Sequence, residues 1–399
     1  MSDTSTTRSA WPRDRCAIVG VGESEYSKDS GVSVTTLAAR AALAALADAG
    51  VDPAEVDGVI RNDMDLVSCA ALADAIGARD LTYYGEAGPG GSGPCAMVAQ
   101  AVGAILSGQA STVVVFRSLN GRSGNRFGLS SELDASIGGG ETMTEFFGPY
   151  GLLSPGQFFA LLTREYMLKT GLTSEQLGHV ALAARRHANN NPRAQMHART
   201  MTLDDYLNSR MLSEPLRLFD YCLETDGAAA VVVTSAERAR DLRHTPALIR
   251  AVAMGSGPRP QPGQMYPVLM REDPLSLPSR HCAETLYARA GLGPSEVDNA
   301  QLYDCFTITA LLQLEDYGFC AEGEAGEFAA DGELEIGGRL PFNTSGGHMS
   351  EGYIHGMNHI VEGVRQIRGT STSQVPGAAV SLVTSAPPPS TSAMILVAP

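Results

Sequence analysis

Short apolar runs rich in valine recur along the chain and alternate with segments of helical periodicity. Runs of this length, bounded by glycine and polar residues, are typical of strands that a sheet buries on both faces. We predict such strands at residues 16–22, 58–60, 112–116, 228–235, 247–257, 299–304, 378–383 and 393–398. Helical periodicity marks residues 34–45, with Gly50 as the stop, and residues 283–290. The alternation predicts a compact α/β fold.

A short repeat relates the two parts of the chain. Residues 49–57 read AGVDPAEVD and residues 290–298 read AGLGPSEVD, so Ala, Gly, Pro, Glu, Val and Asp recur at the same places. Each copy lies between a predicted helix and a predicted strand, and a glycine-bearing apolar strand opens each part. The repeat predicts two related α/β halves, residues 15–240 and 241–399, after a disordered tail at residues 1–14.

A polar, glycine-rich stretch interrupts the first half. Residues 118–140 read SLNGRSGNRFGLSSELDASIGGG, which is longer than an ordinary connection between elements. We therefore expect a loop insertion at about residues 118–160 that shapes a pocket or a subunit contact.

Charge and composition exclude several classes of function. The formal net charge of −15 argues against a nucleic-acid partner, and an acidic substrate would need a local basic patch. Runs of about 18 apolar residues are absent from the sequence, so we expect no membrane insertion. The seven cysteines are scattered and form no CxxC pair, which indicates a reducing, cytoplasmic setting without a disulfide framework.

Three further segments have the composition of functional loops. They read GPGGSGPCAMVAQAVGAILSGQA at 88–110, LYDCFT at 302–307 and NTSGGHMSEGYIHGMNH at 343–359. Together they resemble the active-site loops of the thiolase superfamily, specifically its lipid-transfer-protein or sterol-carrier branch. The resemblance implies the thiolase fold, in which two duplicated α/β halves pack as α-β-α-β-α layers.

The residues that carry thiolase chemistry are replaced in all three segments. In thiolases a Cys at a helix N-terminus is the nucleophile, because the helix dipole favours its thiolate, and Gly91 stands at that position here. Tyr303 replaces the Asn of the second segment, where Asp304 and Phe306 match. Tyr353 replaces the His of the third. Thiolysis through an acyl-enzyme therefore cannot proceed in the usual way.

The third segment keeps the glycines and the asparagine of the thiolase pattern at Asn343, Gly346 and Gly347. The distal Cys of thiolases has no counterpart in residues 381–396. Backbone N–H groups around Gly91, Gly346 and Gly347 are expected to hold an enolate oxygen, because glycine allows close approach.

The two tyrosines resemble those of bacterial steroid side-chain-cleaving aldolases of the lipid-transfer-protein type. That resemblance implies retro-aldol cleavage of a β-hydroxyacyl-CoA, with a 17-hydroxy steroid thioester giving a 17-ketosteroid and propionyl-CoA. It also implies a homodimeric core that binds a small partner with an OB-fold and a zinc ribbon, as in a heterotetramer. No cofactor is expected, since CoA is part of the substrate.

Retro-aldol chemistry needs two proton-transfer groups and donors to the thioester oxygen. We assign Tyr303 as the base on the hydroxyl and Tyr353 as the acid, and the reverse assignment stays open. A free tyrosine has a pKa of about 10, and nearby positive charge or hydrogen-bond donors would lower it, so His348 and His355 are candidates for that role. Asp304 either orients a water or a neighbouring side chain, or caps a helix.

Other readings of the same residues predict different functions. His355 and His359 have the spacing of a metal pair, but no third ligand accompanies them in the sequence, so we expect no metal. GVGESEY at 20–26 lacks the third glycine of a dinucleotide loop. Cys95 and Cys305 are expected to be core thiols, with Cys305 facing away from Tyr303. A thiolase or acyltransferase using another thiol, and a non-catalytic acyl-CoA or lipid-binding subunit, remain the alternatives.

Overall fold

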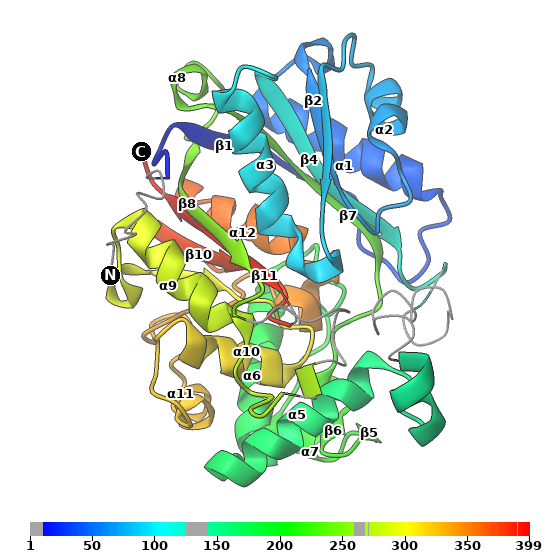
Figure 1. The fold of residues 1–399 in the computed structure, drawn as a ribbon, viewed down its shortest axis with the longest axis vertical. Coiled ribbons are helices and arrows are strands. Elements are labelled where there is room, and N and C mark those ends of the chain that lie inside the picture. The colour runs from blue at the N-terminus through cyan, green and yellow to red at the C-terminus, as the bar shows by residue number, and fades with distance from the viewer. Residues whose placement is uncertain (1–10, 125, 127–142, 259–267, 270, 389) are drawn as a thin grey trace, which may run out of the picture.

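The computed structural model describes residues 11–124, 126, 143–258, 268–269, 271–388 and 390–399 (Figure 1). The strands are β1 (Cys16–Glu23), β2 (Gly58–Asn62), β3 (Tyr83–Ala87), β4 (Thr112–Asn120), β5 (Met211–Ser213), β6 (Leu216–Arg217), β7 (Asp226–Ser235), β8 (Ala247–Gly255), β9 (Asn299–Gln301), β10 (Val380–Thr384) and β11 (Thr391–Val397). Each predicted strand is present, although β9 is shorter than expected.

The helices cover both faces of the sheet (Figure 1). They are α1 (Val34–Ala49), α2 (Cys69–Ile76), α3 (Pro94–Leu106), α5 (Pro155–Thr170), α6 (Ser174–Asn190), α7 (Leu203–Leu207), α8 (Ala236–Ala239), α9 (Pro278–Ala290), α10 (Thr307–Asp316), α11 (Ala325–Ala330) and α12 (Met357–Arg368). Of the described helices, none is long and apolar enough to cross a membrane.

Nine of the described strands form one mixed sheet in the order β3-β2-β4-β7-β1-β8-β11-β10-β9. The strands of the two halves follow the same order and direction towards the centre of the sheet. In the first half β2 and β4 are parallel, and β4–β7 and β7–β1 are antiparallel. In the second half β9 and β10 are likewise parallel, and β10–β11 and β11–β8 are antiparallel. The duplication that the sequence repeat predicts is therefore visible in strand order and direction.

The layers of the fold come from the alternating faces of the strands. In β4, Val113 and Val115 pack in one core cluster with α3 and α12, while Val114 and Phe116 pack in another with α1. Helices α3 and α12 contact strands of both halves, whereas α1 packs on the first half and α9 on the second. The expected α-β-α-β-α order of layers is confirmed.

Local signals begin and end the helices. Ser33 accepts the N–H of Thr36 at 3.2 Å at the start of α1, and Gly50, with φ of +71°, ends it as predicted. Asp52 caps the single turn Pro53–Glu55 that follows α1. Residues 155–217, which hold α5 to α7 with β5 and β6, were not assigned from the sequence.

Two predicted boundaries differ from the structure. Residues 11–14 do not belong to a disordered tail, because Trp11 packs against the core and Asp14 pairs with Arg250 at 2.9 Å. The expected insertion at 118–160 is too wide, since β4 continues to Asn120 and α5 begins at Pro155. Residues 127–142 of that insertion, like residues 1–10 of the tail, lie outside the described residues.

Candidate functional site

The two predicted catalytic tyrosines meet in the structure. Their hydroxyl oxygens lie 2.7 Å apart, at hydrogen-bond distance. Tyr303 follows strand β9 and is 2% exposed, while Tyr353 is half-buried in the loop that precedes α12. The site thus forms where a strand end and a helix start come together, although the two residues are far apart in the chain.

Side chains, rather than a longer strand, hold the backbone of Tyr303. Asn343 accepts the N–H of Leu302 at 2.8 Å and donates to its carbonyl oxygen at 3.0 Å. The Tyr303 N–H donates to Thr384 Oγ1 at 2.9 Å, and its carbonyl oxygen accepts from Gln313 Nε2 at 2.8 Å. Strand β9 therefore ends at Gln301, which is why the predicted strand 299–304 is shorter.

Gly91 is placed directly against Tyr303. A side chain at Gly91 would put its Cβ 2.0 Å from Tyr303 Oη and 2.6 Å from Cζ. A cysteine cannot occupy this position unless Tyr303 moves, because Cβ atoms do not approach other atoms so closely. Tyr303 therefore fills the space in which a thiolase nucleophile would begin.

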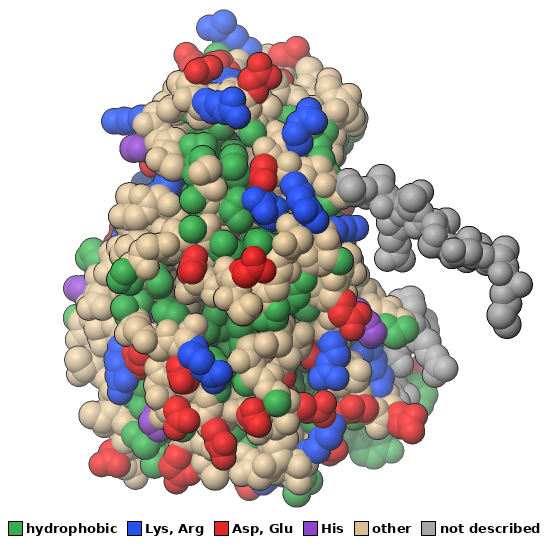
Figure 2. Space-filling model, turned by 90° about the vertical axis from the view of Figure 1, so that its left-hand side faces the viewer, with side chains coloured by type: hydrophobic (Ala, Val, Ile, Leu, Met, Phe, Trp, Pro, Cys, Tyr) green, Lys and Arg blue, Asp and Glu red, His purple; other side chains and the backbone are tan. Residues whose placement is uncertain are grey.

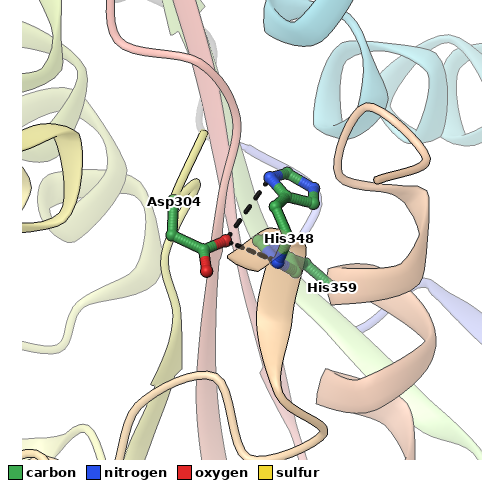
Figure 3. Close-up of side chains that lie close together, drawn as sticks. All are labelled: Asp304, His348 and His359. Carbon is green, nitrogen blue, oxygen red and sulfur yellow. Dashed lines mark hydrogen bonds and ion pairs between the residues drawn. The ribbon is translucent and has the colours of Figure 1, made fainter. Parts of the chain in front are cut away.

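Asp304, His348 and His359 form a fully buried cluster beside the tyrosines (Figure 3). Asp304 Oδ1 lies 3.4 Å from His348 Nδ1 and 3.2 Å from His359 Nε2, and the two imidazole rings are stacked at 4.0 Å. The His348 ring contacts both Tyr303 and Tyr353 edge-on, with centroids 4.6 and 4.8 Å away. The cluster therefore packs against both tyrosine rings through His348.

Asp304 also caps the turn Gly347–Glu351. Its carboxylate accepts the backbone N–H of His348 at 2.8 Å and of Met349 at 3.3 Å, so it both caps a turn and orients side chains. The Asp304, His348 and His359 ligand atoms lie within 4.8 Å of one another and could hold a metal ion. The pair considered from the sequence, His355 with His359, does not form this cluster, and the expected absence of a metal stays a prediction.

His355 faces a different set of partners. Its Nδ1 accepts a hydrogen bond from Arg117 Nε at 3.1 Å, and Arg117 in turn pairs with Asp65 at 3.3 Å. All three residues are at most 3% exposed. The backbone of His355 has φ of +51°, a left-handed conformation that non-glycine residues seldom adopt.

The electrostatics of the site exclude one of the two ways in which the histidines were expected to act. Burial lowers the pKa of His348 and of His355 well below the usual range, the neighbouring imidazoles lower that of His348 further, and Arg117 lowers that of His355 further. Burial raises the pKa of Tyr303 and of Tyr353 well above 10. Neutral imidazoles cannot lower a tyrosine pKa by positive charge, so tuning of this kind is not what the two histidines do.

The tyrosine pair is nevertheless asymmetric. Burial raises the pKa of Tyr303 first, and the negative charge of an ionised Tyr353 and the hydrogen bond to it raise this pKa further. Burial also raises the pKa of Tyr353 first, and Cys222 and Cys305 raise it further, while the hydrogen bond with Tyr303 and the charge of Arg117 lower it. Arg117 thus acts on Tyr353 in the direction that favours negative charge.

A cavity of about 1080 Å³ opens at the tyrosine pair. Tyr303, Tyr353, His355 and Gly91 line it. The other predicted site residues are buried outside its described lining: Asp304, His348, Asn343, Gly346 and Gly347. Gly346 donates its N–H to the Asn343 carbonyl oxygen, so that N–H is already engaged in this geometry. That the N–H groups of Gly91 and Gly347 hold the enolate oxygen stays a prediction.

The cysteines near the cavity are not prepared to act as nucleophiles. Cys95 is fully buried away from the cavity, and burial raises its pKa to about 12. Cys305 and Cys222 do line the cavity, so Cys305 is not confined to the core as the sequence predicts. Burial also raises the pKa of both thiols, which keeps them protonated at neutral pH.

The charge of the cavity differs from that of the chain. On the face shown in Figure 2, Asp and Glu side chains gather towards the lower end, and Lys and Arg lie scattered among them. Among the described lining residues of the cavity, cations outnumber the carboxylates of Asp205 and Glu224. The cationic residues are Lys28, Arg122, Arg126, Arg185, Arg199 and Arg210.

Sequence reasoning missed Arg117 and Asp65 as residues of the site. Arg117 ends the valine run of β4, and a charged residue inside such a buried strand was a signal that could have been followed. Asp65 lies in the loop between β2 and α2 and gave no comparable signal.

Comparisons with known proteins identify relatives of similar sequence. A family model described as Thiolase C-terminal domain-like matches residues 264–398. The chain is 46% identical over 385 residues to 17-hydroxy-3-oxo-4-pregnene-20-carboxyl-CoA lyase of Mycobacterium tuberculosis, covering 96% of this chain and 99% of that protein. It is 45% identical to the steroid side-chain-cleaving aldolase of Thermomonospora curvata, covering 95% and 97%.

A solved structure has the same fold over nearly the full length. The Ltp2-ChsH2(DUF35) aldolase matches with a TM-score of 0.89 at 44% identity, covering 97% of this chain and 98% of that chain. Relatives of this identity and coverage place the sequence in one family with them. The chain therefore belongs to the steroid side-chain-cleaving aldolases of the thiolase superfamily.

Proposed function

We propose that the protein cleaves a carbon-carbon bond in a β-hydroxyacyl-CoA by a retro-aldol reaction. The substrate is a 17-hydroxy steroid with a three-carbon side chain as its CoA thioester, and the products are a 17-ketosteroid and propionyl-CoA. The observation that carries the proposal is the contact of the Tyr303 and Tyr353 hydroxyls at 2.7 Å, with Tyr303 in the space of the missing nucleophile. The names of two relatives support the substrate class.

The reaction needs proton transfers and no oxidant or reductant. A base removes the proton of the β-hydroxyl, the oxygen electrons form the new C=O bond, and the Cα–Cβ electron pair moves to Cα. The thioester enolate that results takes a proton at Cα and becomes propionyl-CoA. Two proton-transfer groups beside one cavity meet these requirements without a covalent intermediate.

We assign the base to Tyr353 and the acid to Tyr303, the reverse of the order expected from the sequence. The positive charge of Arg117 favours the ionised form of Tyr353, against the effect of burial. Tyr303 then gives its proton towards the enolate, and the pair exchanges a proton across its short hydrogen bond to restore the starting state.

The cavity supports the choice of substrate. Its volume of about 1080 Å³ is at the upper end of the range for ligand pockets, which suits a polycyclic acyl group. The excess of cationic lining residues supplies the local basic patch that CoA phosphates require in a chain of net charge −15.

We further propose that the chain works as a homodimeric core with a small partner of the DUF35 class, carrying an OB-fold and a zinc ribbon. Support comes from the match to an aldolase structure whose name includes such a partner. The prediction that no cofactor is needed, other than the CoA of the substrate, belongs to the same proposal.

Mass-spectrometric product analysis tests the proposal. The chain, co-expressed with the partner, is incubated with the steroid thioester, and both expected products are sought. Alkylation with iodoacetamide and a Cys95→Ala variant accompany it, and neither is expected to stop cleavage, because the burial of Cys95 keeps its thiol protonated. Loss of turnover in both, or acyl transfer in place of cleavage, would support a thiol-dependent reaction instead.

A further inference from the structure

The contact with Arg117 determines which tautomer a neutral His355 adopts. A guanidinium has only N–H donors, so the ring nitrogen that it faces must accept. Arg117 Nε lies 3.1 Å from His355 Nδ1, and Nδ1 therefore carries the lone pair. The proton of a neutral His355 must then lie on Nε2, the ring nitrogen on the other side.

Buried contacts fix the guanidinium itself. Arg117 Nη1 donates to the Ser118 carbonyl oxygen at 2.6 Å and lies 3.3 Å from Asp65 Oδ2. Asp65 is held in place because it accepts the N–H of Ser118 at 2.6 Å and of Val67 at 2.9 Å. The chain of contacts therefore runs from the β2–α2 loop through β4 to the loop before α12.

The surroundings also keep His355 uncharged. Burial lowers its pKa, and the nearby Arg117 lowers it further. Among the described residues, the titratable groups near His355 include Arg117 on β4, Tyr353 in its own loop with ring centroids 5.1 Å apart, and His348. In the described contacts Asp65 pairs with Arg117, and Arg117 in turn faces His355.

We propose that His355 is a neutral catalytic hydrogen-bond donor, and that Asp65 and Arg117 are the positioning residues that fix its Nε2–H tautomer. His355 lines the cavity together with Tyr353 and Tyr303, which places the residue beside the reacting end. In the proposal its Nε2–H stabilises the thioester oxygen on which charge develops as the Cα–Cβ bond breaks, and it keeps its proton throughout. The inference rests on the proposed function and adds a side-chain donor to the backbone donors expected from the sequence.

Nitrogen-15 NMR of the histidine-labelled full chain, co-purified with its partner, tests the tautomer directly. The His355 signal, identified by its loss in a His355→Gln variant, should show a neutral ring with Nε2–H at every pH between about 5 and 8. In an Asp65→Asn/Arg117→Met double variant, which leaves no buried charge unpaired, the ring should titrate or mix tautomers. An Nδ1–H tautomer or an imidazolium in the wild-type chain would overturn the inference.

Kinetics separate positioning from mere stability. His355→Phe should lower kcat by about a hundredfold with little change in KM, and His355→Gln should recover part of it because its amide also donates. Arg117→Lys, which keeps a cationic donor, should retain more activity than Arg117→Met. Wild-type kcat in His355→Phe would overturn the inference. A wild-type chain with the Nε2–H tautomer that cleaves no thioester would instead overturn the proposed function.

Discussion

The close packing of Gly91 against Tyr303 is the clearest sign that this site no longer performs thiolase chemistry. We predict that Gly91→Ala lowers kcat by at least about tenfold, because the new Cβ displaces the Tyr303 hydroxyl from Tyr353. Overpacking should also lower the free energy of unfolding by about 1–3 kcal/mol. Steady-state kinetics and urea denaturation measure the two effects.

Gly103 provides the matched control for that substitution. A Cβ at Gly103 meets nothing within 4 Å, and the residue lies within helix α3. Gly103→Ala should therefore leave kcat unchanged and stabilise the chain by up to about 1 kcal/mol. If Gly91→Ala behaved like Gly103→Ala, Tyr303 would not depend on the missing side chain.

Only some residues of the site could be predicted from the sequence. Tyr303 and Tyr353 were found because they replace functional residues within segments that resemble known loops. The contact of Arg117 with His355 joins residues from different elements, and no local pattern records such a pair. The engagement of the Gly346 N–H with the Asn343 carbonyl oxygen could not be predicted either, because a glycine that faces a substrate and one that closes a turn look the same in the sequence.

At the scale of elements, most strands of the large sheet could be predicted from the sequence, whereas the helices and strands between β4 and β7 could not. Continuous apolar runs such as β7 are buried on both faces of the sheet, and a run of this kind is typical of a strand. Strand β3 alternates between half-buried and exposed residues at the edge of the sheet, so its pattern was too weak to assign. Helices α5 to α7 pack in one core cluster with α9 and α10 of the second half, and local periodicity does not reveal such a tertiary contact.

The contact between α9 and α10 should make stability depend on pH. Burial raises the pKa of Asp316 to about 7, although Ser279 and Arg280 oppose the shift. The folded chain therefore binds this proton more tightly than the unfolded chain, so the stabilisation is fully present below about pH 4 and is lost as pH rises to about 7. Asp316→Asn should remove up to about 4 kcal/mol of this pH dependence.

Urea denaturation at pH 5 and pH 8 measures that effect. The wild-type chain should lose more stability between the two values than Asp316→Asn does, and the exposed Asp331→Asn should behave as wild type. An identical loss in Asp316→Asn and in the wild-type chain would show that the buried proton of Asp316 is absent.

For the chain as a whole, the contrast between an acidic protein and a cationic cavity predicts how the substrate binds. We expect Arg199→Gln and Arg210→Gln, both exposed at the cavity, to raise KM severalfold with kcat unchanged, because each removes attraction for CoA phosphates. The effect should shrink at high salt. Steady-state kinetics at low and high ionic strength measure it.

Arg240→Gln is the control, since Arg240 is exposed and lies outside the described lining of the cavity. It removes the same charge from the chain and should leave KM unchanged. An equal rise of KM in all three variants would mean that net charge, rather than the cavity, attracts the substrate.

Cleavage of the steroid thioester by Tyr303→Phe and Tyr353→Phe, each co-purified with the partner, tests the central claim most directly. Each substitution removes one hydroxyl and keeps the ring that packs against His348. The account predicts that both variants fold as the wild type does, bind the thioester, and release propionyl-CoA at least about a hundredfold more slowly. Release at the wild-type rate by either variant would contradict it.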